Sequence, residues 1–149
     1  MLFRSQKIVA AIEDGGLRET VRLLGYQPHS VMLRYAYDSH LFLSPSVTAE
    51  SGDTEGGAPV SIIEMAASGM LVVATFHCDI PQVIEHEKTG LLAPERDVDA
   101  LVQALQWLID HPERWPQMQE ASRRHVEKSF DARRQGQALG ELYRQLTES

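Results

Sequence analysis

The stretch GDTEGGAPVSIIEMAASGMLVVAT, residues 52–75, decides the fold because it joins an acidic loop, a helix and a buried strand. Pro59 suits the first turn of a helix, where its missing N–H costs nothing, and the serine and glycine at 68–69 end that helix. The apolar run 71–75 predicts a buried strand. Glu64 is the only charged residue between positions 56 and 77, and a buried charge requires a partner.

Short apolar runs alternate with helical periodicity along the rest of the chain. We expect helices at 5–14, 28–40 and 59–68, a helical turn at 80–84, helices from 97 to the end with breaks near 112 and 130–131, and strands at 21–26, 40–44, 71–75 and 90–93. This alternation predicts an α/β domain with a mainly parallel sheet. Loops as long as the one at 45–58 tend to be functional or disordered.

Composition limits the classes of function. With 149 residues and 43% hydrophobic content, we expect residues 1–149 to form one globular domain. The formal net charge of −7 argues against a nucleic-acid-binding surface. A single cysteine indicates a reducing compartment, and no apolar run is long enough to span a bilayer or to form a signal peptide. The expected localisation is cytoplasmic.

The central stretch has the features of an anion site. Ligands of open α/β sheets bind beyond the carboxyl ends of the strands, where the loop 45–58 lies. Small residues at 56–58 let backbone amides approach an anion at the helix start. Ser61, Glu64 and Ser68 share one face of the helix, and a carboxylate there can accept two hydrogen bonds from a ribose diol. Glu55 could bind sugar hydroxyls in the same way.

Simpler interpretations stay open on the pattern alone. The glycine pair could form only a turn, and Glu64 could face solvent or pair with a nearby Lys or Arg. Glu55, together with Glu50 and Asp53, could be a solvated acidic loop. The six histidines form no ligand-spaced cluster and the adjacent His77-Cys78 pair is interpreted as incidental, so we expect no metal.

Residues 52–75, followed by HCDIPQVIEHEKTGLLAPERDVDALVQAL at 77–105, resemble the C-terminal donor-binding domain of family 4 (group 1) glycosyltransferases. The segments at 23–56 and 125–146 extend the resemblance over nearly the whole chain. It implies half of a GT-B fold, with a Rossmann-like parallel sheet and flanking helices. It also implies a retaining hexosyltransferase of cell-surface polysaccharide synthesis that uses a nucleotide-sugar donor, a glycan or lipid-linked acceptor, and no metal or other cofactor.

The resemblance assigns roles to individual residues. It implies that Glu55, the catalytic assignment, contacts hydroxyls of the donor sugar, and that Glu64 contacts the ribose diol. Eight residues, 56–63, separate the two glutamates, one more than in the commonest form of the family motif. The remaining donor-binding assignments are backbone contacts in the loop and first helical turn: Gly56, Gly57, Ala58, Val60 and Ser61.

Some expected parts of the family's enzymes have no counterpart in this sequence. These are the acceptor-binding N-terminal domain, the first two strands of the donor domain and a basic loop that grips the diphosphate. In a sheet ordered 3-2-1-4-5-6, those two strands would lie between the strands expected at 21–26 and 40–44. Either these two strands pair directly, or another chain fills the space, or the fragment is marginally stable. Exposed strand edges would then favour self-association.

Two classes of function follow from these expectations. The chain is either the donor-binding part of a glycosyltransferase, including one subunit of a split enzyme, or a non-catalytic nucleotide-sugar-binding or interaction module. Basic residues near the C-terminus are interpreted either as a solvated helix face or as a contact with an anionic membrane surface. They are Arg123, Arg124, His125, Arg133 and Arg134.

Overall fold

The computed structural model describes residues 2–54 and 56–147, with side chains from residue 6 onward. The chain divides into two compact units, Met1–Leu33 and Arg34–Ser149, which are described separately. The first unit contains α1 (Leu2–Asp14), and the boundary between the units falls within α2 (His29–Tyr37). The expectation of a single domain over residues 1–149 stays a prediction.

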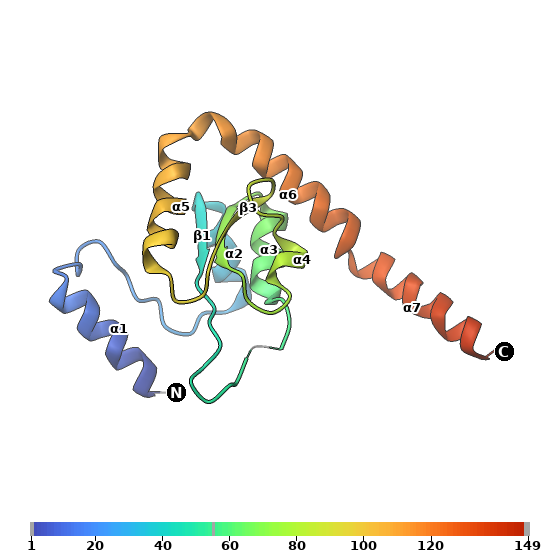
Figure 1. The fold of residues 1–149 in the computed structure, drawn as a ribbon, viewed down its shortest axis with the longest axis horizontal. Helices are drawn as coiled ribbons and strands as arrows, with labels where there is room; N and C mark the ends of the chain where they lie inside the picture. Colours follow the sequence, from blue (N-terminus) through green and yellow to red (C-terminus); the bar gives the residue numbers. More distant parts are fainter. Residues whose placement is uncertain (1, 55, 148–149) are drawn as a thin grey trace. The chain divides into compact units, whose positions relative to one another are not determined.

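The second unit alternates strands and helices, as the sequence predicts (Figure 1). Its elements are β1 (Leu41–Ser44), α3 (Val60–Ser68), β2 (Leu71–Thr75), α4 (Ile80–Val83), β3 (Gly90–Ala93), α5 (Val98–Asp110), the 3-10 turn η1 (Pro112–Arg114), α6 (Trp115–Ser129) and α7 (Ala132–Thr147). Asp97 caps α5 as expected, because its Oδ1 accepts the Ala100 N–H at 2.8 Å.

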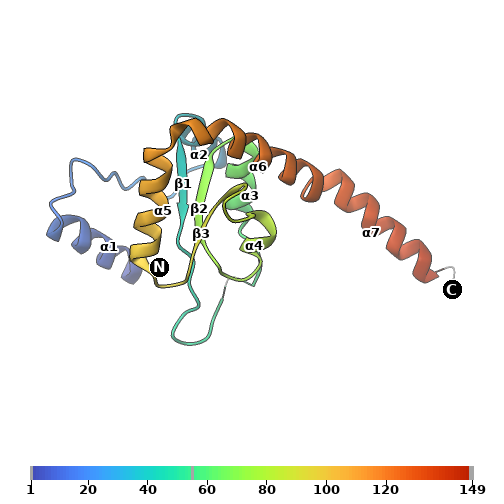
Figure 2. The same cartoon turned by 45° about the horizontal axis from the view of Figure 1, so that its top comes forward.

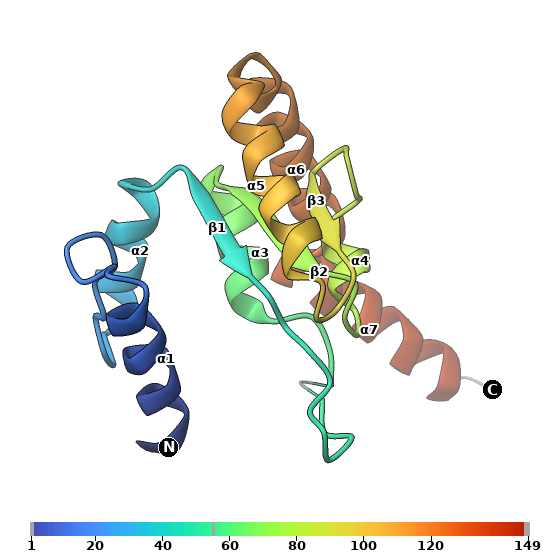
Figure 3. The same ribbon diagram turned by 60° about the vertical axis from the view of Figure 1, so that its left-hand side comes forward.

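The sheet is three-stranded and parallel, in the order β1-β2-β3 (Figure 3). Leu41 pairs with Leu71 at the start of β1, and Val72 pairs with Gly90 at the start of β3. All five residues of the central strand β2 are buried, as expected for a parallel strand that is covered on both faces. The predicted α/β class with flanking helices is therefore confirmed.

Helices cover both faces of the sheet. In Figure 2, α5 lies on one side of the strands and α3 and α4 lie on the other. The core under α5 contains Leu71, Val73 and Leu91 together with Leu108 and Met118. On the other side α3 buries Ile62, Met65 and Ala66, and α6 packs against α3.

The strand predicted at 21–26 does not form, and this expectation was wrong. Residues 21–26 have no regular structure, and Leu23 and Tyr26 are 55% and 98% exposed. An isolated extended segment gains neither ladder hydrogen bonds nor burial, so an apolar run bounded by glycine does not become a strand without a neighbour. Among the described residues β1 pairs only with β2.

The C-terminal helix α7 carries Leu139, Leu142, Tyr143 and Leu146, which are all at least half exposed. No residue of α7 is buried. Within residues 2–54 and 56–147, no helix has both the length and the apolar character needed to cross a membrane.

Candidate functional site

The loops that follow the three strands meet at the carboxyl edge of the sheet. Residues 45–58 connect β1 to α3, the turn at 76–79 connects β2 to α4, and residues 94–97 connect β3 to α5. The hydroxyl of Thr75, the last residue of β2, donates to the carbonyl of Ser46 just after β1. The first part of the long loop is therefore held against the end of the central strand.

The start of α3 has the geometry that the glycine-rich segment requires. Gly56 has a φ of 72°, in the left-handed region that favours glycine. Pro59 is the N-cap residue, and its carbonyl accepts the Ile62 N–H at 3.0 Å. Val60 is 67% exposed and Gly57 and Ala58 are half-buried, so this end of the helix faces outward. The amides of a first helical turn have no intrahelical acceptor and suit an anion.

The three residues of the predicted polar stripe all lie on α3. Ser61 and Glu64 are both half-buried, three residues apart. The Ser68 hydroxyl donates to the Met65 carbonyl at 2.7 Å, within the same helix. Glu55, the predicted catalytic residue, lies outside the described residues. The roles assigned to these residues stay predictions.

An acidic side chain lies beside the glycine loop. A Cβ atom at Gly57 would lie 3.9 Å from Oδ2 of Asp79, in the turn after β2. A carboxylate at this position repels a phosphate bound to the amides of the loop. A bound diphosphate would therefore require additional positive charge nearby.

A polar cluster that the sequence does not predict lies at this edge, and we call it the loop latch: Thr48, His77 and Glu95. Glu95 Oε2 accepts the Thr48 backbone N–H at 2.7 Å, and Oε1 lies 2.6 Å from His77 Nδ1. The Thr48 hydroxyl also lies 3.3 Å from Glu95 Oε1. Each residue follows a different strand, so one carboxylate connects the three loops.

Hydrogen bonding keeps the carboxylate of the latch ionised. The backbone N–H of Thr48, with a smaller contribution from His77, lowers the pKa of Glu95 below its ordinary value. The His77 side chain is fully buried, whereas a quarter of the Glu95 side chain is exposed. Because an ionised carboxylate only accepts hydrogen bonds, His77 Nδ1 carries the proton in this contact.

His77 is therefore part of the loop latch and is not incidental to the structure. His77 is 1% exposed and its Nε2 lies 3.3 Å from the Cys78 sulfur, while Cys78 itself is exposed. The signal available in the sequence was a polar residue after each of two buried strands, at the ligand-binding edge. In the part of the chain that the structure describes, no group of three or more His, Cys, Asp or Glu residues could hold a metal.

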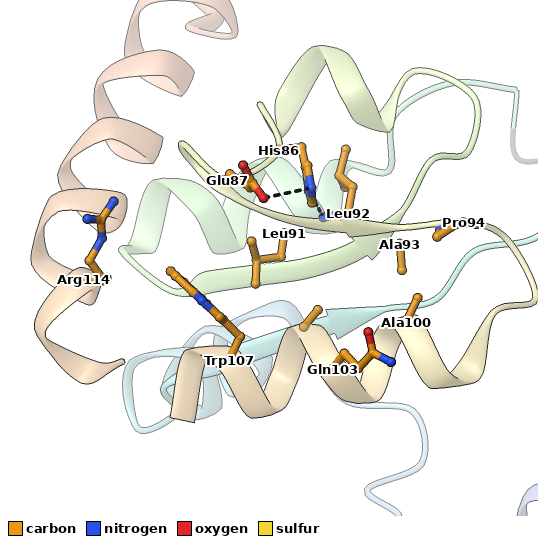
Figure 4. A pocket seen from close by; sticks show the side chains of 11 residues that line it. His86, Glu87, Leu91, Leu92, Ala93, Pro94, Ala100, Gln103, Trp107 and Arg114 are labelled. Carbon is orange, nitrogen blue, oxygen red and sulfur yellow. Dashed lines mark hydrogen bonds and ion pairs between the residues drawn. The ribbon is translucent and has the colours of Figure 1, made fainter. Parts of the chain in front are cut away.

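A concave feature lies away from the predicted site. A groove of about 520 Å³ between β3 and α5 is lined by His86, Leu92, Gln103, Trp107 and Arg114 among others (Figure 4). His86 accepts the Leu92 backbone N–H at 2.9 Å and lies 3.8 Å from the Glu87 carboxylate. None of the described site residues predicted from the sequence lines this groove.

The basic residues of α6 are largely paired with acidic side chains. Arg123 contacts Glu127 at 2.9 Å and Arg124 contacts Glu120 at 3.1 Å, both along the helix. His125 lies 3.2 Å from a Glu85 oxygen. These pairs favour the interpretation as a solvated helix face over a membrane contact.

The fold and this edge define a class of protein: a parallel α/β unit of the Rossmann type with a glycine-rich loop before a helix. The family model described as "Glycosyl transferases group 1" matches residues 4–111. The amylovoran biosynthesis glycosyltransferase AmsK of Erwinia amylovora is 37% identical over 140 residues, which is 94% of this chain and 34% of AmsK. The chain belongs to the group 1 glycosyltransferase family. It spans about a third of the length of the curated relatives it matches.

Solved structures support the same fold. Sucrose-phosphate synthase from Thermosynechococcus elongatus superposes with a TM-score of 0.79 at 26% identity, over 96% of this chain and 34% of that one. HepE of Anabaena, determined in complex with UDP, superposes with a TM-score of 0.83 at 18% identity, over 95% of this chain and 36% of HepE. The expected relation to GT-B glycosyltransferases is therefore confirmed at the level of fold.

Proposed function

We propose that this chain is the donor-binding part of a retaining glycosyltransferase of polysaccharide synthesis. In this proposal a hexose passes from a nucleoside diphosphate sugar to a glycan or lipid-linked acceptor. The observation that carries the proposal is the glycine-rich loop at the carboxyl edge of the parallel sheet, directly before α3. Family membership and the biosynthetic role in the name of AmsK support it.

The proposed roles follow from the chemistry of the donor. Glu64 accepts hydrogen bonds from the ribose hydroxyls, and Glu55 accepts them from the donor sugar. The amides at 56–61 approach the sugar and the diphosphate, which becomes the leaving anion when its bond to the anomeric carbon breaks. The carbon then bonds to the acceptor hydroxyl oxygen, and the hydroxyl proton leaves with the diphosphate. Fixing the donor in one orientation lowers the entropic part of the barrier.

A binding experiment tests the assignment of Glu64. The first step is a thermal-shift screen of UDP-, GDP- and ADP-sugars, because a ligand of the folded state raises the unfolding temperature. Calorimetry with the best donor then compares the wild type with Glu64→Gln. Loss of charge-assisted hydrogen bonds costs about 2 kcal/mol, so Kd rises roughly 30-fold. Glu50→Gln is the matched control, since it removes the same charge from an exposed position in the loop. Equal affinities for the wild type and Glu64→Gln would defeat the assignment.

A second variant locates the phosphates. If they bind the amides around Gly57, Asp79→Asn removes a repulsive charge and tightens binding of the nucleoside diphosphate by about 1 kcal/mol, or roughly fivefold. The corresponding nucleoside, which carries no phosphate, serves as the control ligand and should bind both proteins equally. An unchanged affinity of the variant for the diphosphate would place the phosphates elsewhere.

A further inference from the structure

One carboxylate ties together the segments that follow all three strands. Glu95 follows β3, and it contacts Thr48 after β1 and His77 after β2. The three residues are far apart in sequence, with separations of 47 between Thr48 and Glu95 and 18 between His77 and Glu95. The loop latch therefore fixes the relative positions of the three loops, which strand pairing alone does not do.

Burial makes this arrangement costly to break. His77 is 1% exposed, and an imidazole that loses its acceptor inside the protein has an unsatisfied polar group. The Arg96 guanidinium also holds Thr48, because it donates a hydrogen bond to the Thr48 carbonyl. The backbone of Thr48 is thus held through both its N–H and its carbonyl oxygen.

A tight turn at residues 49–53 follows Thr48. The Ala49 N–H donates to the Asp53 carbonyl at 2.9 Å, and the Gly52 N–H donates to the Ala49 carbonyl at 2.9 Å. The chain therefore reverses within five residues and returns toward the point where Thr48 is held. At the far end, the Gly56 N–H lies 3.3 Å from the Thr54 hydroxyl oxygen.

The glycine segment also lies beside the turn that carries His77. Gly57 lies beside the Asp79 carboxylate, and Asp79 is two residues after His77 in the turn between β2 and α4. Displacing His77 would move this turn, and displacing Glu95 would release Thr48. Thr48 and the turn beside Gly57 are thus both connected to the contact between His77 and Glu95.

We propose that His77 and Glu95 are positioning residues that set the geometry of residues 56–61 for a nucleoside diphosphate sugar. They act through Thr48 and the turn at 76–79 and do not touch the donor. The inference rests on the proposed function, because only a donor site at 56–61 gives the position of this loop a catalytic meaning.

The test uses two substitutions at Glu95, since His77 is fully buried and its variants could fail to fold. Glu95→Ala removes both contacts of the latch. Glu95→Gln keeps an oxygen that can accept the Thr48 N–H, and its NH2 group can donate to His77 Nδ1 when the imidazole proton moves to Nε2. Glu113→Ala, at an exposed position in η1, controls for the loss of one negative charge. Urea unfolding of each variant measures global stability separately.

The first measurement is amide hydrogen exchange, which needs no ligand. Glu95→Ala should raise the exchange rates of the hydrogen-bonded amides of Thr48, Ala49 and Gly52 at least tenfold, while amides of β2 keep their protection. The second is the Kd of the nucleotide sugar that the wild type binds, which should rise about tenfold in Glu95→Ala. Glu95→Gln should restore most of both properties, and Glu113→Ala should change neither.

The two proposals fail in different ways. If the wild type binds no nucleotide sugar, the proposed function fails and the positioning role falls with it, whatever the exchange data show. If the wild type binds and Glu95→Ala leaves either the loop exchange or the Kd unchanged, the positioning role alone is overturned. A weakened Kd in Glu95→Ala that Glu95→Gln does not restore would also overturn it, because the charge and not the position would then matter.

Discussion

Substituting Gly90 by alanine tests both the packing of the sheet and its connection to the site. Gly90 begins β3 and pairs with Val72 of the central strand. A Cβ atom at this position would lie 2.6 Å from the Val72 carbonyl oxygen and 2.9 Å from the Ile84 Cγ2 atom. Real Cβ atoms essentially never approach other heavy atoms closer than 3.0 Å, so the variant must rearrange.

The neighbours of Gly90 have little freedom to move. Val72 pairs with Phe42 on its other side, so its carbonyl is held within the ladder, and Ile84 is fully buried. The two strands must therefore separate by a few tenths of an ångström, with loss of packing in the core. Overpacking of this kind costs about 1–3 kcal/mol. For a chain of this length, the melting temperature should fall by roughly 3–10 °C.

Urea unfolding followed by circular dichroism measures this cost. Gly136→Ala is the matched control, because it adds the same methyl group on α7, where nothing lies within 4 Å. Alanine is preferred over glycine within a helix, so the control should be neutral or stabilised by about 0.5–1 kcal/mol. Since β3 leads to Glu95, Gly90→Ala should also speed amide exchange at Thr48. A Gly90→Ala variant with the unfolding midpoint of the wild type would refute the packing argument.

Three further changes test the core and the ionised carboxylates. Leu108→Ala, at a fully buried position, should cost about 2–5 kcal/mol in urea unfolding, whereas Ile109→Ala on the exposed side should change stability by less than about 0.5 kcal/mol. Ser122 is buried and its hydroxyl has no partner among the described residues. Ser122→Ala should therefore be neutral or stabilising by about 1 kcal/mol in the same assay. A large loss of stability would show that the hydroxyl does make a hydrogen bond. In the folded state Lys88 lowers the pKa of Glu85, and the Thr48 N–H lowers the pKa of Glu95. The two ionised carboxylates therefore stabilise the fold above pH 4.5, and this stabilisation is lost as the pH falls through their folded-state pKa values. Melting temperatures measured from pH 3 to 7 should fall below about pH 4.5, and less steeply in Glu95→Gln.

The sequence predicts those elements whose local signals agree with their tertiary surroundings. The helix after Pro59 and the strand 71–75 are bounded by residues that start and stop regular structure, and the strand is uniformly apolar because both of its faces are covered. The segment 21–26 has similar local signals but no neighbouring strand among the described residues, so the local pattern gave the wrong answer. A segment becomes a strand only when another strand pairs with it, so the composition of one segment is not enough to predict it.

The candidate site also has a part that the sequence predicts and a part that only the fold brings together. The glycines, Ser61 and Glu64 lie close together in the chain, so a motif can describe them. The loop latch joins positions that are separated by 47 and 18 residues, and only the register of three parallel strands brings them together. A buried histidine after one strand and a glutamate after the next are not distinctive in a single sequence, so the sequence alone does not indicate the loop latch.

The open edge of β1 explains why the latch matters for the loop that follows it. β1 is an outer strand of the described sheet, and Leu43 within it is 45% exposed. Both outer strands pair on one side only, but β3 is buried and β1 is only partly buried, so the loop that begins at Pro45 follows a weakly supported strand. The contacts of Thr75 with Ser46 and of Glu95 with Thr48 lie within four residues of the end of β1 and supply support from β2 and β3 instead. A strand that pairs with the free edge of β1, from any source, should therefore slow amide exchange in β1 and reduce the effect of Glu95→Ala on the loop. The predicted self-association through this edge is testable in the same way, because protection of the β1 amides would then rise with protein concentration.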